Sequence, residues 1–96
     1  MRPSKILEMN RALIRETAHR FQTANPRLFG SALHGQDTEK SDLDLLVDPP
    51  PGTTLFDLGG LQEELSELLG VRVDVRTPGD LPARFRLKVV AEAVPI

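Results

Sequence analysis

The sequence predicts an α+β fold, an α/β arrangement of two layers in which a small mixed β-sheet is packed by helices, in the order α-β-β-α-β-α. Two observations on periodicity predict it. Apolar residues recur at helical spacing in residues 4–23 and again in residues 55–69, whereas apolar and charged residues alternate strictly in residues 71–76. A third observation is that clusters of Pro, Gly and Asn separate these segments. A chain of 96 residues can build a modest core, so we expect residues 1–96 to form a single domain.

The composition is that of a folded protein, since 40% of the residues are apolar and 27% are charged. A net charge of −2 argues against a broad nucleic-acid-binding face, so we predict no direct nucleic-acid partner. The absence of cysteine excludes disulfides and thiolate metal sites and suits a reducing compartment. No apolar run approaches the ~18 residues of a membrane span, and the N-terminus has no signal-peptide core. We therefore expect a soluble, cytoplasmic protein without a membrane partner.

The first predicted helix covers residues 4–23, with Ser4 as its N-cap, and Asn25-Pro26 is expected to stop it. A short strand over residues 27–29 should follow. Three arginines on the polar face of the helix form either a solvated face or a surface for a partner or a phosphate: Arg11, Arg15 and Arg20.

The middle of the chain is predicted to return to the sheet. Residues 31–34 should form a helical turn and residues 36–41 a polar loop. Residues 42–48, with the sequence DLDLLVD, are predicted to form a strand, which three prolines and a glycine at residues 49–52 then end.

The second half of the chain contains the clearest periodicities. A Leu-rich helix is predicted over residues 55–69, capped by the threonine pair before it and ended by Gly70. The strand over residues 71–76, VRVDVR, places its valines on one face and its charged residues on the other. A short helix should run from about residue 80 to residue 93, and residues 94–96 either add a strand edge or fray.

Two aspartates in the central strand require a chemical explanation, because a strand core normally excludes carboxylates. Asp42 and Asp44 share one face of the strand, with their Cα atoms ~6.6 Å apart. Carboxylates at such a spacing can bind metal ions, and hard oxygen ligands suit Mg²⁺ or Mn²⁺. Asp74 could join them if its strand pairs beside theirs, an adjacency that the sequence leaves open. The alternative is that all three are solvent-facing residues beside a polar loop.

A Gly-Ser turn stands upstream of these aspartates. Gly30 and Ser31 follow a predicted strand and lead into a helical turn, so they expose backbone N–H groups and a hydroxyl that suit phosphate oxygens. The spacing from Gly30 to Gly35 is that of a P-loop. However, Gln36-Asp37 stands where that motif requires Lys followed by Ser or Thr, so a P-loop is excluded.

Together these residues resemble the signature of a known superfamily. Gly30-Ser31, ten further residues and then Asp42-x-Asp44 form the pattern G-S-x10-D-x-D, which is similar to that of the nucleotidyltransferase (DNA polymerase β-like) superfamily. The chain is too short for the two-domain members and resembles the minimal nucleotidyltransferase family, often the antitoxin half of a HEPN/MNT toxin–antitoxin pair. The resemblance covers nearly the whole chain and implies a nucleotidyltransferase fold.

The resemblance also implies roles for the residues of the pattern. Gly30 and Ser31 would hold the triphosphate of ATP, Asp42 and Asp44 would bind two Mg²⁺ ions, and Asp74 would help to activate the attacking hydroxyl. The reaction would transfer a nucleoside monophosphate to a hydroxyl and release pyrophosphate. In the family, AMP from ATP is placed on a tyrosine of the HEPN partner, an RNase toxin, which is thereby silenced. The implied partner is therefore a HEPN-domain toxin in a hetero-oligomer.

Two residues directly before Asp42 are further site candidates, and two other functions remain as alternatives. Lys40 and Ser41, directly before Asp42, are further candidates for phosphate binding, although Lys40 could equally be a solvated loop lysine. Where family members often have Arg, this chain has His34, which could contact phosphate or serve in capping or packing. The alternative functions are a binding-only antitoxin and a nucleotide-binding regulatory subunit without transferase activity.

Overall fold

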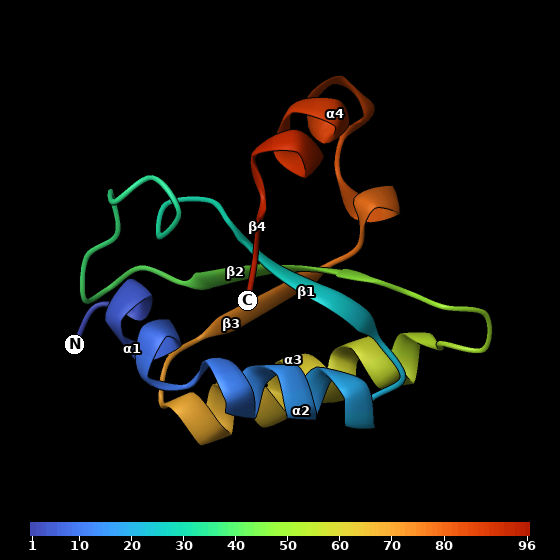
Figure 1. Ribbon diagram of the computed structural model, residues 1–96, viewed down its shortest axis with the longest axis horizontal. Coiled ribbons are helices and arrows are strands. Elements are labelled where there is room, and N and C mark those ends of the chain that lie inside the picture. Colours follow the sequence, from blue (N-terminus) through green and yellow to red (C-terminus); the bar gives the residue numbers. More distant parts are fainter.

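A four-stranded sheet with helices on both faces forms the protein, which the computed structural model describes over residues 1–96 (Figure 1). The helices are α1 (Pro3–Met9), α2 (Arg11–Arg20), α3 (Leu55–Leu69) and α4 (Ala83–Glu92), and a 3₁₀ turn, η1 (Pro78–Asp80), precedes α4. The strands are β1 (Ala24–Phe29), β2 (Leu43–Asp48), β3 (Val73–Arg76) and β4 (Val94–Pro95).

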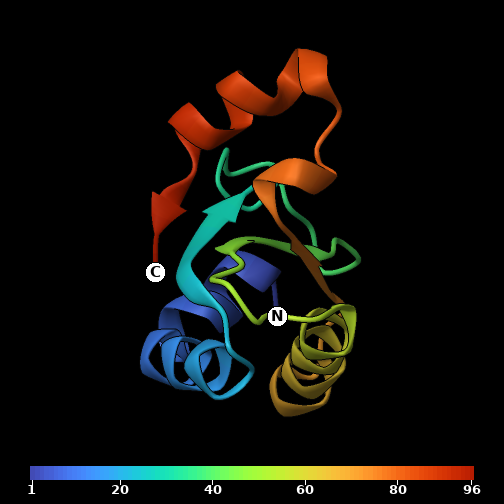
Figure 2. The same cartoon turned by 90° about the vertical axis from the view of Figure 1, so that its right-hand side faces the viewer.

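The strands lie in the order β3-β2-β1-β4. Strand β1 is antiparallel to both β2 and β4, whereas β2 and β3 run parallel. Helices α1, α2 and α3 lie along one face of this sheet, and α4 stands on the opposite side, as Figure 2 shows from a second direction. The predicted α+β class, with a small mixed sheet packed by helices, is confirmed.

The core lies between the sheet and α1–α3. Strand β2 is its centre, because Leu43, Leu45 and Val47 alternate toward the helices and are fully buried. The remaining residues of this core come from the three helices, from β3 and from the turn after β1: Leu7, Ile14, Ala18, Ala32, Leu61, Leu65, Leu69 and Val73. None of the helices combines the length and the apolar composition needed to cross a lipid bilayer.

The N-terminal helix differs from the prediction, because it is broken into α1 and α2 at Asn10. The backbone of Asn10 is not helical, with φ −134° and ψ 23°, and its side-chain amide donates to the carbonyl of Ile6. Ser4 is not the N-cap, since Pro3 occupies the first turn and Arg2 the cap position. The N–H of Ser4 instead donates to the side chain of Asp37.

Contrary to the prediction, Asn25-Pro26 does not end the helix that precedes it. Helix α2 ends at Arg20, and both residues lie inside β1, at a bulge where the register with β2 shifts between Ala24 and Arg27. Asn25 adopts a φ of 52°, which a bulge accommodates and a regular strand does not. Proline is tolerated there because a bulge interrupts the hydrogen-bond ladder.

The C-terminal prediction is resolved in favour of a strand edge. Strand β4 pairs with β1, and the N–H of Ile96 donates to the carbonyl of Pro26. The predicted final helix begins later than expected, because Pro82 separates η1 from α4. Two arginines of α2 hold this tail, since Arg11 and Arg15 donate to the carbonyls of Pro95 and Ile96. The third, Arg20, forms an ion pair with Glu64 of α3.

The burial of β2 gives a direct test of the core. Leu45 is 0% exposed and Leu55 is 84% exposed, so the same substitution should lower the stability strongly at Leu45 and hardly at all at Leu55. We expect Leu45→Ala to lower the free energy of unfolding by about 2–5 kcal/mol, because it removes buried methyl groups and leaves a cavity. Leu55→Ala should change it by no more than about 0.5 kcal/mol. Urea denaturation of both variants measures the difference, and equal losses would contradict the assigned core.

Candidate active site on the open face of the sheet

The pairing of β2 with β3 brings two of the predicted aspartates side by side. Asp44 is the register partner of Asp74 in adjacent parallel strands. The preceding partners, Leu43 and Val73, are both buried against the helices, so the aspartates point to the opposite face, the side on which α4 stands. Asp42 precedes β2 by one residue and lies two positions before Asp44, on the same face. The adjacency that a three-carboxylate site requires is therefore present.

The central carboxylate, Asp44, is half-buried between two strands. On its other side its register partner is Phe29 of β1. Burial raises the pKa of Asp44 to about 6, and the negative charges of Asp74 and Asp42 act in the same direction against a smaller opposing effect of Arg76. Three carboxylates gathered on one face thus repel each other, an arrangement found far more often at functional sites than in structural cores.

Two arginines of β3 and its approach flank these aspartates. Arg72 Nε lies 3.7 Å from Asp42 Oδ2, and an Arg76 Nη2 nitrogen lies 3.3 Å from Asp74 Oδ2. The pairs are partly exposed and contribute little to stability. The alternation in VRVDVR predicted that these arginines share one strand face with Asp74. Asp44 forms no ion pair.

Whether these residues suit a divalent metal can be judged from the donors themselves. No three His, Asp or Glu side chains converge closely enough to form a ready-made metal cluster, and Asp42 and Asp74 each lie near an arginine. The donor set nevertheless fits. All candidate ligands are hard carboxylate oxygens, and a cation would offset the burial and the neighbouring negative charges that raise the pKa of Asp44.

The Gly-Ser turn lies directly against the central carboxylate. Gly30 has a φ of +79°, and a Cβ atom added to it would overlap Asp44 Oδ2 and lie 3.1 Å from Asp44 Cγ. The N–H groups of Leu33 and His34 donate to the carbonyl of Gly30, which closes the turn. The N–H groups of Ser31 and Ala32 make no hydrogen bond within the protein. Free backbone donors therefore lie on the turn that touches Asp44, an arrangement that suits phosphate oxygens.

Lys40 and Ser41 are placed differently. The Ser41 hydroxyl accepts a hydrogen bond from the N–H of Thr38 at 2.8 Å, so it closes the loop before β2. The Lys40 backbone N–H donates to the Thr38 hydroxyl, while the side chain is exposed and has no partner. No hydrogen bond or ion pair joins either residue to the aspartates or to the Gly30 turn. His34 Nε2 lies 3.4 Å from a Glu92 carboxylate oxygen of α4.

One residue that holds the site loop was missed by sequence reasoning. The Asp37 carboxylate is buried and accepts hydrogen bonds from Arg2 at 2.9 Å and from the N–H of Ser4 at 2.8 Å. Burial alone would raise the pKa of Asp37, but its hydrogen bonds with Ser4 and with Arg2 outweigh that effect and hold it below the usual value. These partners lie more than 30 residues away, so no local pattern could indicate them.

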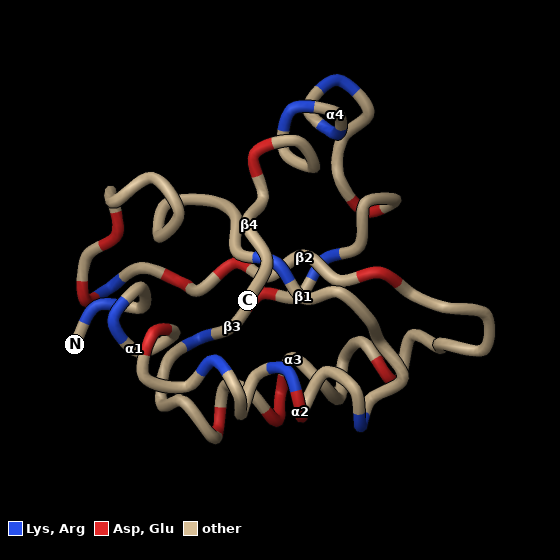
Figure 3. The backbone as a smooth tube through the Cα atoms, in the orientation of Figure 1, with Lys and Arg blue, Asp and Glu red and all other residues tan.

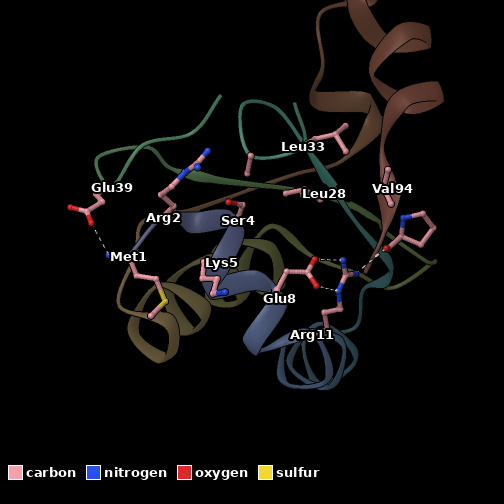
Figure 4. A pocket seen from close by; sticks show the side chains of 12 residues that line it. Met1, Arg2, Ser4, Lys5, Glu8, Arg11, Leu28, Leu33, Glu39 and Val94 are labelled. Atoms are coloured by element: carbon pink, nitrogen blue, oxygen red, sulfur yellow. Dashed lines mark hydrogen bonds and ion pairs between the residues drawn. The ribbon is translucent and has the colours of Figure 1, made fainter. Parts of the chain in front are cut away.

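The largest cavity lies away from the aspartates. It has a volume of about 650 Å³ and is bounded by α1, the turn after β1 and the C-terminal strand (Figure 4). Its wall includes Leu28, which pairs with core residue Leu45 and so belongs to the helix-covered face. Most charged side chains in its wall already form ion pairs within the protein, such as Glu8–Arg11. We therefore locate the candidate active site on the open face of the sheet around Asp44 and not in this cavity.

This chain is similar in sequence to several known proteins. A family model described as "Nucleotidyltransferase domain" matches residues 11–96. The Protein adenylyltransferase MntA of Thermococcus cleftensis is 35% identical over 80 residues, which are 83% of this chain and 81% of the relative. A second archaeal relative, from Methanocaldococcus jannaschii, carries the name of a protein adenylyltransferase provisionally and is 38% identical over 69 residues, 72% of this chain and 74% of its own.

Solved structures show the same fold. One that is provisionally named a minimal nucleotidyltransferase superposes with a TM-score of 0.86 at 39% identity and covers 97% of this chain and 95% of its own. A toxin–antitoxin structure with AMP-PNP has a TM-score of 0.75 over 90% of this chain and 71% of its own, at 20% identity, and so supports the fold alone. The expected fold and the expected family resemblance are both confirmed.

The contact between Gly30 and Asp44 can be tested with a matched glycine. Gly35 also has a positive φ, +69°, but a Cβ added there would meet no atom within 4 Å. Gly35→Ala should cost about 1 kcal/mol for the backbone alone, whereas Gly30→Ala should cost a further 1–3 kcal/mol or so because it displaces a side chain. In an Asp44→Ala background the difference between the two costs should shrink when measured by urea denaturation, because the carboxyl group is gone and only the Cβ atom of residue 44, at 3.2 Å, remains close. An undiminished difference there would show that the Asp44 carboxyl group is not what excludes a side chain at Gly30.

The raised pKa of Asp44 predicts a pH dependence in protein freed of divalent ions with EDTA. A carboxyl whose folded pKa exceeds its unfolded value stabilises the fold fully below the unfolded pKa of 3.8, and this contribution is lost as pH rises through about 6. Asp37 acts in the opposite sense because its pKa is lowered, so variants must be compared with the wild type. The stability of Asp44→Asn relative to wild type should therefore rise between about pH 4 and pH 7.

Urea midpoints over this pH range provide the measurement. Glu67→Gln, at an exposed position of α3 far from the site, is the control and should follow the wild-type curve in parallel. Parallel curves for Asp44→Asn as well would contradict the electrostatic description of the site.

Proposed function

We propose, because this chain belongs to the nucleotidyltransferase domain family, that it transfers AMP from ATP to a hydroxyl group of a protein. The observation that carries the proposal is the convergence of three separate segments on one open face of the sheet. Asp44 comes from β2 and Asp42 from the residue just before it. Asp74 comes from the neighbouring strand in direct register with Asp44, and Gly30 from a turn that touches Asp44. These are the residues of the pattern G-S-x10-D-x-D and the third carboxylate that accompanies it.

Each group has a role that its position allows. The free N–H groups of Ser31 and Ala32 would bind phosphate oxygens of ATP and orient the chain of phosphates against Asp44. The acceptor hydroxyl would attack the α-phosphorus, the bond from that phosphorus to the β-phosphate oxygen would break, and pyrophosphate would leave. The proton of the hydroxyl would pass to Asp74, which is partly exposed on the same face.

A divalent metal would be held by Asp42 and Asp44, with Asp74 as a further ligand. Two Mg²⁺ ions, or Mn²⁺ in their place, would neutralise phosphate charge and stabilise the attacking and leaving oxygens. The surroundings of Asp44 favour such binding, since burial and then the charges of Asp74 and Asp42 raise its pKa, and a cation would stabilise the ionised form. Lys40 and Ser41 are left with a smaller part: Lys40 is free to reach the outer phosphates, while Ser41 keeps the loop closed.

For the acceptor we propose a tyrosine of a HEPN-domain toxin, which would make this chain an antitoxin. Two observations support a protein as the acceptor. The relative from Thermococcus cleftensis is named a protein adenylyltransferase, and several structures with the same fold are toxin–antitoxin complexes described as MntA-HepT.

The experiment is AMP transfer from ATP to a purified HEPN-domain toxin in the presence of Mg²⁺. We expect Asp42→Asn combined with Asp44→Asn to slow transfer at least ~100-fold, because several kcal/mol of charge stabilisation would be lost. Asp48→Asn is the matched control, since it lies on the same strand and face but pairs with Arg27 instead of facing Asp74. It should transfer at close to the wild-type rate.

Two outcomes would reject this proposal. Transfer by the double variant at the wild-type rate would show that the aspartates are not the site. Protection of the toxin without nucleotide, and equally by the double variant, would show that the chain acts by binding alone. Calorimetric titration with ATP and Mg²⁺ provides a second readout that requires no acceptor.

A further inference from the structure

Helix α4 has no layer packed against its outer side. It stands on the face of the sheet that carries the aspartates, whereas α1–α3 cover the other face (Figures 1 and 2). None of its residues is buried. Few polar contacts attach it to the rest of the protein. Arg86 donates to carbonyls of the η1 region, including those of Pro78 and Leu81, and Glu92 lies near His34.

The outer side of α4 combines apolar and basic side chains. Leu87 is 86% exposed, Phe85 46% and Val90 36%. One turn before Leu87 lies Arg84, and directly after it Lys88, so that cations border the exposed leucine. Neither Arg84 nor Lys88 forms an ion pair, and Figure 3 shows the basic colouring of this helix above the acidic residues of β2 and β3. The one acidic residue of the helix, Glu92, lies at its end.

The position of α4 limits what can use this surface. The core helices close one face of the sheet, so any acceptor must approach Asp44 and Asp74 from the open side, where α4 projects. The strand that carries Asp74 leads through η1 directly into α4, so the helix is held at a short distance along the chain from the candidate site. A macromolecule that contacts α4 therefore meets the aspartates on the same side of the protein.

We propose that α4 is the docking surface for the protein that presents the acceptor hydroxyl. The complementary surface on that protein is a groove with an apolar floor, which receives Leu87, and an acidic rim, which pairs with Arg84 and Lys88. An RNA partner would use the cations but would gain little from an aliphatic side chain that is 86% exposed. The inference rests on the proposed transfer to a protein hydroxyl and adds how that protein is recognised.

The test measures the affinity of the full chain for the HEPN-domain toxin by calorimetry at low and at moderate salt. Leu87→Asp should weaken binding at least about tenfold, since it puts a charge on an apolar anchor. Leu55→Asp is the matched control, because Leu55 is 84% exposed at the start of α3 and should change binding less than about twofold. The charge reversal Arg84→Glu with Lys88→Glu should weaken binding and reduce its dependence on salt.

The transferase assay then separates docking from chemistry. Leu87→Asp should raise KM for the toxin while the affinity for ATP with Mg²⁺ stays at the wild-type value. If wild type binds the toxin through α4 but transfers no AMP, the docking surface stands and the proposed reaction fails. If transfer proceeds and the α4 variants match the Leu55→Asp control, the reaction stands and the docking surface fails.

Three further results would overturn the inference. One is the absence of measurable toxin binding by the unaltered chain. Another is loss of binding to a single-stranded RNA oligonucleotide by the charge-reversal variant while toxin binding is unchanged. The last is sedimentation showing that Leu87→Asp converts a dimer of this chain to a monomer without changing its affinity for the toxin.

Discussion

The parallel pairing of β2 with β3 is the interaction on which both the core and the candidate site depend. One register places Leu43 beside Val73 within the core and Asp44 beside Asp74 on the open face. Side chains alternate with a period of two, so a slip of one residue would turn the leucines out and bury the aspartates. The apolar core therefore enforces the geometry of the carboxylates, and the site needs no separate device to bring them together.

This arrangement is unfavourable for the isolated carboxylates. Asp44 is half-buried between Phe29 and Asp74, and Gly30 presses against it so closely that any side chain there would collide. This crowding raises the pKa of Asp44, because it buries the carboxylate and places it beside the negative charge of Asp74. Its cost is offset by the fully buried leucines on the other face of the same strand. Carboxylates crowded in this way occur more often at functional sites than in structural cores.

Features with local causes could be predicted from the sequence, whereas features with distant causes could not. The bounds of α3 follow from its leucine spacing, the capping threonine and Gly70, and the structure reproduces them at residues 55–69. The pattern that joins Gly30 to Asp44 was likewise readable because both ends lie within 15 residues or so of sequence. The bulge at Asn25 and the burial of Asp37 each depend on partners from other segments. The position of Asp74 beside Asp44 required the strand order itself.

The two faces of the sheet are covered unequally. Helices α1, α2 and α3 bury one face well. On the other face only a few residues, such as Leu46 and Leu81, are buried, and the remainder stays open around the aspartates. An uncovered helix with an exposed leucine between cations gains nothing in the isolated chain, because it contributes no buried residue to the core. In the proposed docking, a second protein covers this apolar surface and stands on the face that carries Asp44 and Asp74.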